Sequence, residues 1–461
     1  MNPETRLPRE SVLAFLKPSK AIMQLAVPAT IALLAKAVYN IVDTAYIGLL
    51  HSENALAAVG VTLPLLLIFV SVENIFAAGA AVLAGRQLGA GEKDNAGVTV
   101  STVVAASVVV GVLLCVGGIL FMEPLLRTFG ASEAVMPLAK DYAFWMFIAA
   151  LANLPAQSLN CAARAESSVK ISSIAVITGA VLNIVLDPVF MFDWGLGMGV
   201  GGASLATTIS QVVTFGILLW FYLGGHSIIR LKLDFIKPTA KLFREIIQIG
   251  VPTAVIQICL AVATSLTNVA AASLPDSDLI IAAYGVVQRL ILIGCYVVMG
   301  FMQGYQPVAA YAFGSRNKER FHECARFAMK QTLLLSVGVG AVYILLSKPL
   351  IMLFNRNPAV VAYGVRLLAS QVILYPAFGL CYMMTITFQT IGAARFGLFL
   401  STVRQGLFYI PVILVLPGMI GVNGIYFAQP VADVLTLAVC LVSYPALTRL
   451  ATLNMEKERK A

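Results

Sequence analysis

The sequence has few charged residues, only three histidines and no paired spacing of cysteines. Asp, Glu, Lys and Arg make up 11% of its 461 residues, whereas a soluble domain usually carries about twice that share. The seven cysteines show no spacing typical of a metal site or a disulfide framework. His51, His226 and His322 fall in expected loops, and no HExxH motif or pair of acids marks a hydrophobic segment. These absences argue against a soluble domain, a disulfide-rich protein and a membrane-embedded enzyme.

What the sequence has instead is long hydrophobic segments. Its hydrophobic content is 59% and its mean hydropathy is +0.89. A run of ~20 apolar residues is enough to cross a bilayer as a helix. We therefore expect an all-α polytopic membrane protein in contact with the lipid bilayer, and no nucleic-acid partner despite the net charge of +9. The twelve expected transmembrane helices are residues 21–50, 54–84, 95–121, 138–163, 170–193, 202–224, 243–273, 279–310, 324–346, 360–388, 394–418 and 422–448.

The positions of Lys and Arg predict how the chain lies in the membrane. Basic residues gather near both ends of the chain and between the sixth and seventh expected helices, whereas "LLHSEN", "SLPDSD" and "PGMIGVN" contain none. Loops rich in Lys and Arg stay in the cytoplasm. Both termini are therefore expected in the cytoplasm of a multi-pass protein of the plasma (inner) membrane. The polar, basic N-terminus does not resemble a cleavable signal peptide.

The two halves of the chain resemble each other at an offset of 224 or 225 residues. An offset that covers six helices gives both halves the same direction through the membrane, which is typical of transporters. The landmarks that repeat are Pro28 and Pro252, Gly60 and Gly285, Gly89 and Gly314, and Pro124 and Pro349. The expected organisation is a cytoplasmic segment 1–20, a first lobe 21–224, a cytoplasmic linker 225–242, a second lobe 243–448 and a cytoplasmic tail 449–461.

Two carboxylates lie inside expected membrane helices of the first half. "YNIVDTAYIG" contains Asp43, and "VLNIVLDPVF" contains Asp187 followed by Pro188. A charged group in hydrocarbon is costly and usually functional. Asn183 precedes Asp187 by one turn on the same helix face, and Pro188 predicts a bend. Two other interpretations stay open, because Asp187 could cap a broken helix and Asp43 could lie in the solvated outer interface.

The second half does not repeat these carboxylates. Thr267 occupies the position that corresponds to Asp43, and no acid occurs in "RQGLFYIPVIL", which corresponds to the segment around Asp187. The ionisable groups that could couple transport are therefore concentrated in the first half. We assign no role to Arg289, Arg404 and Asp433.

Several motifs together resemble the multidrug and toxin extrusion (MATE) transporters, and most closely their DinF-like prokaryotic branch. "YNIVDTAYIG", "LAGRQLGAGEKD", "NCAARAE", "LNIVLDPVF" and "GGASLATTIS" carry the resemblance, which extends over about residues 20–448. It implies two six-helix bundles around a central cleft. It also implies export of cationic or amphipathic compounds in exchange for H⁺ or Na⁺.

The resemblance also implies roles for individual residues. Tyr142 and Thr207 also have interpretations that need no role in transport. Tyr142 could be an aromatic residue at the membrane interface, and the Thr207 hydroxyl could hydrogen-bond to the backbone of its own helix. The residues expected to couple transport to the ion are Asp43, Asp187, Asn183, Tyr142 and Thr207, and those expected to bind substrate include Asn160 and Tyr39.

Lys36 and Glu73 depart from the family pattern. Lys36 lies seven residues before Asp43, hence about two turns away, and Glu73 lies midway along the second expected helix. The two could form a structural ion pair, because an unpaired charge there would be costly. Alternatively, both line the substrate cavity, where Lys36 would meet an acidic group of the substrate.

These features predict a secondary antiporter that exports amphipathic, cationic drugs or metabolites in exchange for H⁺ by alternating access. We expect a monomer that binds a small-molecule substrate and no cofactor or resident metal. Na⁺ remains an alternative ion at Asp43, Asp187 and Asn183, since carboxylate and amide oxygens bind it too. A flippase of a lipid-linked precursor is the other alternative within this fold. Its relatives tend to have more helices and a strongly basic cavity.

Overall fold

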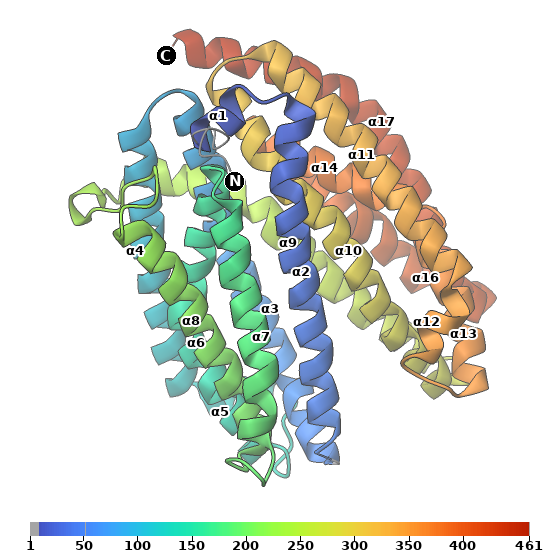
Figure 1. Ribbon diagram of the computed structural model, residues 1–461. Coiled ribbons are helices and arrows are strands. Elements are labelled where there is room, and N and C mark those ends of the chain that lie inside the picture. The colour runs from blue at the N-terminus through green and yellow to red at the C-terminus, as the bar shows by residue number, and fades with distance from the viewer. Residues whose placement is uncertain (1–8, 51, 461) are drawn as a thin grey trace, which may run out of the picture. The chain divides into compact units, whose positions relative to one another are not determined.

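The computed structural model describes residues 9–50 and 52–460, and within them the regular structure is entirely helical. His51 and parts of the expected terminal segments 1–20 and 449–461 lie outside the described residues. The helices, coloured along the chain in Figure 1, are α1 (Arg9–Ala14), α2 (Pro18–Gly48), α3 (Glu53–Gly89), α4 (Lys93–Leu120), α5 (Met122–Thr128), α6 (Met136–Ala165), α7 (Val169–Met191), α8 (Gly199–Leu223), η2 (Leu233–Phe235), α9 (Ala240–Ala272), α10 (Ser277–Gly314), α11 (Lys318–Leu345), α12 (Ser347–Met352), α13 (Pro358–Val372), α14 (Pro376–Thr390), α15 (Ala394–Thr402), η3 (Val403–Tyr409), α16 (Ile410–Ile420) and α17 (Val422–Lys460).

Each of the twelve expected membrane segments is helical. In the described part of the chain, ten helical spans are long and apolar enough to cross a membrane, and the bent pair α13 and α14 makes an eleventh. The remaining expected segment, 138–163, corresponds to α6, whose 30 residues would extend about 45 Å. Polar side chains such as Asn153 and Asn160 make α6 less apolar than the others. The expected all-α polytopic architecture is confirmed.

Two of the expected spans are interrupted. Segment 360–388 consists of α13 and α14, which meet at a bend of 45° just before Pro376. A proline has no backbone N–H to continue the helical ladder, so it suits the start of a new helix. Segment 394–418 contains the π-helical η3 between α15 and α16. Such π-helical inserts often mark functional sites.

The chain forms two compact units. Each unit contains the first turns of one helix whose remaining residues belong to the other unit. The first comprises described residues up to Leu16 and Val27–Gly250. The second comprises Lys17–Ala26 and the described residues from Val251 onward. The first turns of α2 thus belong to the second unit, and the first turns of α9 belong to the first.

Helix α6 occupies the middle of the first unit. It packs against α3, α4, α7 and α8, and α7 in turn packs along α8 (Figure 1). Close approach between α4 and α6 relies on Gly118, where an added Cβ would come within 2.3 Å of the Phe147 ring. Side chains on one face of α6 can therefore reach groups on several neighbouring helices.

The linker after α8 is held against the first unit by a buried carboxylate. Glu166, just beyond the end of α6, accepts hydrogen bonds at Oε2 from Ser227 Oγ (2.7 Å) and the Ile229 N–H (3.0 Å). Burial raises the pKa of the Glu166 carboxyl, and these hydrogen bonds offset part of that rise. Further along the linker, Thr102 Oγ1 of α4 accepts from the Lys237 N–H at 3.0 Å. The linker is thus fixed to α4 and α6 by specific contacts.

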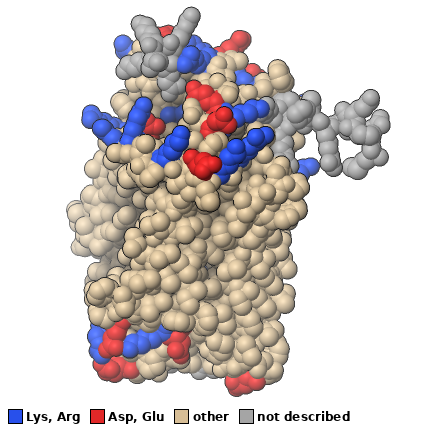
Figure 2. Space-filling view, turned by 90° about the vertical axis from the view of Figure 1, so that its left-hand side faces the viewer, with Lys and Arg blue, Asp and Glu red and all other residues tan. Residues whose placement is uncertain are grey.

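One face of the molecule has an apolar band between two charged ends. Figure 2 shows this face, which is the left side of Figure 1, where α4 and α8 lie. Val109, Leu113 and Val116 of α4 are 51% or more exposed, and their helical spacing puts them on one face. Large exposed apolar side chains in this arrangement are typical of a lipid-facing surface.

Basic residues at the end of the first unit that carries α5 are paired with acids. Arg127 lies 2.8 Å from Glu123 and 2.6 Å from Glu133, and Lys140 lies 2.6 Å from Glu123. The hydrogen bonds from Lys140 and Arg127 lower the pKa of the Glu123 carboxyl. These exposed pairs add little stability, but they neutralise the positive charge of this end.

Tight packing of α10 against the start of α2 leads to a prediction within the second unit. A Cβ added at Gly304 would lie 2.4 Å from the backbone nitrogen of Ala26, whereas one at Gly285 of the same helix would have no neighbour within 4 Å. We expect Gly304→Val to cost about 1–3 kcal/mol, because the Ala26 backbone must shift. Gly285→Val is the matched control, since both changes alter helix propensity equally. Thermal unfolding in detergent measures the difference, and equal melting temperatures would contradict the close approach.

Candidate functional site

Asp187 lies in the last turns of α7, fully buried and next to Asn183. Asn183 Nδ2 donates to Asp187 Oδ1 at 3.0 Å, as the spacing of one turn predicts. The helix continues through Pro188 to Met191. Its last carbonyls are satisfied by the following loop, in which the Leu196 N–H bonds to Val189 O at 2.8 Å. The carboxylate is thus held near a helix end whose backbone is hydrogen-bonded.

Thr207 of α8 completes a short chain of polar side chains. The amide nitrogen of Asn183 lies 3.2 Å from Thr207 Oγ1 as well as 3.0 Å from Asp187 Oδ1. The amide therefore donates to one side chain of α7 and to one side chain of α8, and these two helices pack side by side. The structure brings together three of the residues expected to couple transport to the ion.

Asp43 and Tyr142 approach this group from α2 and α6. Tyr142 interacts electrostatically with Asp43, Tyr39 and Asp187, and Asp187 also interacts with Asp43. Asp43, Tyr39 and Tyr142 are half-buried. All five expected coupling residues therefore gather at one place in the first unit, with Tyr39 beside them. We call Asp43, Asn183, Asp187, Tyr142 and Thr207 the carboxylate group.

The carboxylate group has more hydrogen-bond acceptors than donors. Asp43 Oδ1, Asp187 Oδ2 and Asn183 Oδ1 are buried and have no hydrogen-bond partner among the described residues. An unsatisfied buried oxygen is costly, and the cost is greater when the oxygen carries charge. A bound proton or a small cation would satisfy these oxygens. The arrangement is therefore suited to binding positive charge.

Lys36 and Glu73 belong to a second polar group of the first unit. Glu73, 4% exposed, accepts a hydrogen bond at Oε2 from Asn153 Nδ2 of α6 at 2.9 Å. Lys36 interacts electrostatically with Glu73. The interaction with Lys36 favours the charged form of Glu73, against the effect of burial in the apolar interior. The arrangement fits a structural pair, and both residues remain near the carboxylate group, since Lys36 precedes Asp43 by about two turns of α2.

Asn160 lies away from the carboxylate group. It follows Tyr142 by eighteen residues on α6, a rise of about 27 Å. Its Oδ1 accepts hydrogen bonds from Arg164 and from Ser172 of α7. Of the residues expected to bind substrate, the structure thus separates Asn160 from Tyr39.

Asn153 was not among the predicted site residues, although its position in the sequence could have identified it. Eleven residues separate Tyr142 from Asn153, which is close to three turns, so both lie on one face of α6. A polar side chain three turns along the face of an expected site residue is a usable signal. The partner Glu73 lies 80 residues away in sequence, and no spacing rule identifies such a pair.

The second unit has a neutral pair where the first has its carboxylates. Thr267, which corresponds to Asp43 in the repeat, hydrogen-bonds through its hydroxyl to the hydroxyl of Tyr409 at 2.8 Å. Tyr409 ends η3, in the segment that corresponds to Asp187. The Thr267–Tyr409 contact itself therefore carries no carboxylate, unlike the corresponding residues of the first unit.

Comparison with known proteins agrees with the internal repeat. The family model described as MatE matches the chain twice, at residues 28–189 and 252–415, which is more than half of its length. The two matches begin at Pro28 and Pro252, the first pair of landmarks of the repeat.

Relatives and solved structures extend the likeness over nearly the whole chain. The multidrug export protein MepA of Staphylococcus saprophyticus is 27% identical over 432 residues, covering 94% of each protein. A crystal structure of MATE in complex with MaL6 superposes with a TM-score of 0.91 at 22% identity, covering 96% of this chain and 99% of that one. An outward-facing MATE family transporter of the MOP superfamily gives 0.89 at 23%, covering 95% and 98%. The chain belongs to the MatE family of multi-pass membrane transporters, whose fold places twelve helices in two bundles.

Proposed function

We propose that the chain exports amphipathic, cationic small molecules in exchange for H⁺ by alternating access. Asp43 and Asp187 carry the proton, Asn183, Tyr142 and Thr207 position them, and Tyr39 contacts the substrate. Lys36, Glu73 and Asn160 are secondary candidates for substrate contact. The relative from S. saprophyticus is named a multidrug export protein, which supports drugs as the cargo.

The excess of buried acceptor oxygens is the observation that carries this proposal. Asp43 Oδ1 and Asp187 Oδ2 have no partner among the described residues. Burial disfavours the charged form of a carboxylate, so each of these groups can take up a proton from the outside. Protonation adds a donor to a group that lacks donors and removes a negative charge. A cation held there would lose its counter-charge and be released.

The balance of charge supports a cationic substrate. Lys36 has Glu73 as its acidic neighbour, and the carboxylate group contains no basic side chain, so a negative charge on Asp43 or Asp187 has no counter-charge within that group. Two carboxylates near each other attract a cation and repel an anion. A neutral aromatic surface beside them, from Tyr39 and Tyr142, suits the apolar part of an amphipathic compound.

Na⁺ is a second candidate for the coupling ion, favoured by the same oxygens. Two carboxylates, the Asn183 amide oxygen and the Thr207 hydroxyl are all oxygen ligands, which hard cations prefer. The difference is that Na⁺ must be held by several oxygens at once, whereas a proton needs one.

The remaining parts of the proposal concern topology and assembly. The chain acts as a monomer in the plasma (inner) membrane, with both termini in the cytoplasm. The positive-inside rule supports this orientation. The pairing of Arg127 and Lys140 with acids supports it too, because the opposite end then has little net positive charge.

A transport measurement in cells tests the coupling. Cells that lack their own exporters and express the chain should expel ethidium, and a protonophore should stop the efflux in medium with or without Na⁺. The reason is that exchange of one H⁺ for one monovalent cation moves no net charge, so the pH difference drives the export. Each unit of pH difference supplies about 1.4 kcal/mol, which is a tenfold gradient of the cation. Cells with the empty vector are the control. Efflux that stops only when Na⁺ is removed would contradict H⁺ coupling and favour the sodium alternative.

A further inference from the structure

The second unit contains a buried ion pair that the transport site does not use. Arg404 Nε donates to Asp433 Oδ1 at 2.8 Å, and a second guanidinium nitrogen lies 3.4 Å from Oδ2. Asp433 is fully buried, and the Arg404 side chain is 14% exposed. The guanidinium also lies over the Phe378 ring, 5.4 Å from its centroid. Both charges lie within membrane-spanning segments, where unneeded charge is rare.

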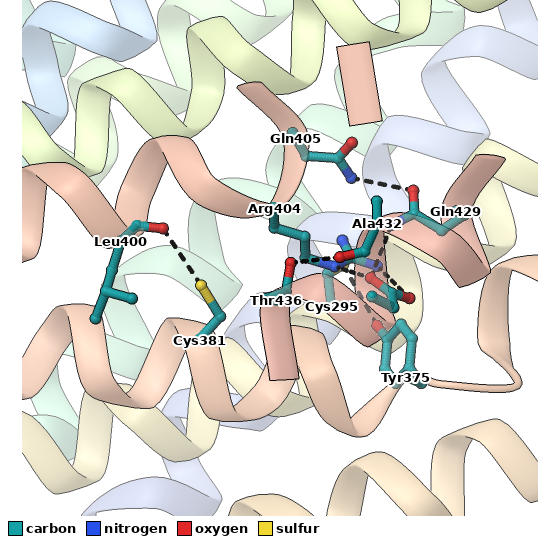
Figure 3. A network of polar contacts seen from close by, with 10 residues as sticks. Cys295, Tyr375, Cys381, Leu400, Arg404, Gln405, Gln429, Ala432 and Thr436 are labelled. Carbon is teal, nitrogen blue, oxygen red and sulfur yellow. Dashed lines mark hydrogen bonds and ion pairs between the residues drawn. The ribbon is translucent and has the colours of Figure 1, made fainter. Parts of the chain in front are cut away.

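Amide side chains extend this ion pair into a network. Gln429 Nε2 donates to Asp433 Oδ1 at 2.9 Å, and Gln405 Nε2 donates to Gln429 Oε1 at 3.4 Å. Figure 3 shows these side chains converging from η3 and α17, with Tyr375 beside them. Tyr375 donates a hydrogen bond to Cys295 of α10 at 3.3 Å.

The network lies where three spans are irregular. Arg404 and Gln405 belong to the π-helical η3. Tyr375 lies at the 45° bend between α13 and α14, and Phe378 lies in the first turn of α14. In α17, Pro430 lies inside the helix between Gln429 and Asp433. Bends and π-helical inserts interrupt the regular helical ladder, and they are the places where a membrane helix changes its curvature most easily.

Stability alone does not explain a buried ion pair here. Removing two charges from water is costly, and well-packed apolar residues often stabilise as well or better. The nearby Thr267–Tyr409 contact holds η3 to α9 without any charge. A pair whose two partners come from different helices can, however, be made and broken as a unit. It then favours one conformation of the interrupted helices over another.

We propose that Arg404 and Asp433 form a charge lock that fixes the three interrupted spans in one conformation, and that the transport cycle opens it. Arg404 and Asp433 are positioning residues in this scheme, since they act through the helices and not on the transported ion. The inference rests on the proposed transport function for its cycle. It concerns side chains to which that function assigns no role.

Paired substitutions separate a lock from a structural contact. Arg404→Gln or Asp433→Asn alone leaves one buried charge unpaired, and each should express poorly. The double variant Arg404→Gln/Asp433→Asn leaves none, so it should fold and bind ethidium with an unchanged dissociation constant. Its maximal rate of ethidium efflux should nevertheless fall about tenfold, because the balance between the two conformations is lost. The exchanged pair Arg404→Asp/Asp433→Arg should recover part of that rate.

A control and a direct probe of opening complete the test. Lys318→Gln/Glu456→Gln removes an exposed ion pair of the same unit and should leave efflux unchanged. In a variant whose only cysteine is Cys295, N-ethylmaleimide should label that thiol several-fold faster during turnover than at rest, because opening releases Tyr375. Equal labelling rates, or ethidium efflux by the double variant as fast as by the wild type, would refute the charge lock. The transport proposal would still stand in that case, because it needs only ethidium efflux by the wild type. Absence of ethidium efflux from the wild type would refute that proposal and the lock's role in it.

Discussion

Asp43→Asn should reduce ion-coupled export to the level of membranes without the protein, while the chain still inserts and folds. The change keeps the size of the side chain but removes the group that binds and releases H⁺. Stability should change by less than about 1 kcal/mol, because Asp43 Oδ1 has no hydrogen-bond partner among the described residues and the amide is neutral. Ethidium efflux from proteoliposomes, together with the melting temperature of the purified protein, measures both parts of the prediction.

The matched control for Asp43→Asn is Asp193→Asn. Asp193 is exposed in the loop after α7, outside the membrane helices, so its loss should leave efflux unchanged. If Asp43→Asn exports ethidium at the wild-type rate, Asp43 does not carry the coupling ion. Asp187 would then have to act alone.

Asp187→Asn should also abolish transport, whereas Asn183→Ala should only slow it. Asn183 donates to Asp187 and Thr207, and each of these hydrogen bonds contributes about 1 kcal/mol to holding the site. Losing them should reduce the rate about two- to tenfold, because the carboxyl that binds H⁺ remains. Asp187→Asn keeps an oxygen that can accept from Asn183 but has no proton to exchange.

The order of the two rates decides what the "LNIVLDPVF" segment does. Initial rates of ethidium efflux, normalised to the amount of folded protein, give this order directly. Transport by Asp187→Asn at or above the rate of Asn183→Ala would mean that Asp187 is a structural group at the end of α7. Melting temperatures of both variants show whether misfolding contributes to any loss.

The membrane helices and the contact between Asn183 and Asp187 could be predicted from the sequence because both follow from local rules. The thickness of the bilayer fixes the length of an apolar span, and a spacing of four residues puts two side chains on one helix face. The approach of Asp43 and Tyr142 to Asp187 depends on the packing of α2, α6 and α7. The sequence predicted that approach only through its resemblance to a known family.

Pairs of residues far apart in the sequence could not be predicted in this way. Glu73 and Asn153 are 80 residues apart, and Arg404 and Asp433 are 29 apart on different helices. No periodicity relates such positions, and their meeting is determined by how α3 packs on α6 and how η3 packs on α17. The π-helical form of η3 also has no clear sequence signal, since it depends on the fit of one extra residue between packed helices.

Proton movement accompanying drug movement is the most direct measure of H⁺-coupled export. Purified protein in proteoliposomes with a trapped pH-sensitive dye, in buffers without Na⁺, should move H⁺ out of the lumen when ethidium is added outside and enters. The same vesicles with Asp43→Asn should show neither movement. Ethidium uptake by the wild type without any change in luminal pH, or uptake only after Na⁺ is supplied, would contradict proton exchange at Asp43 and Asp187.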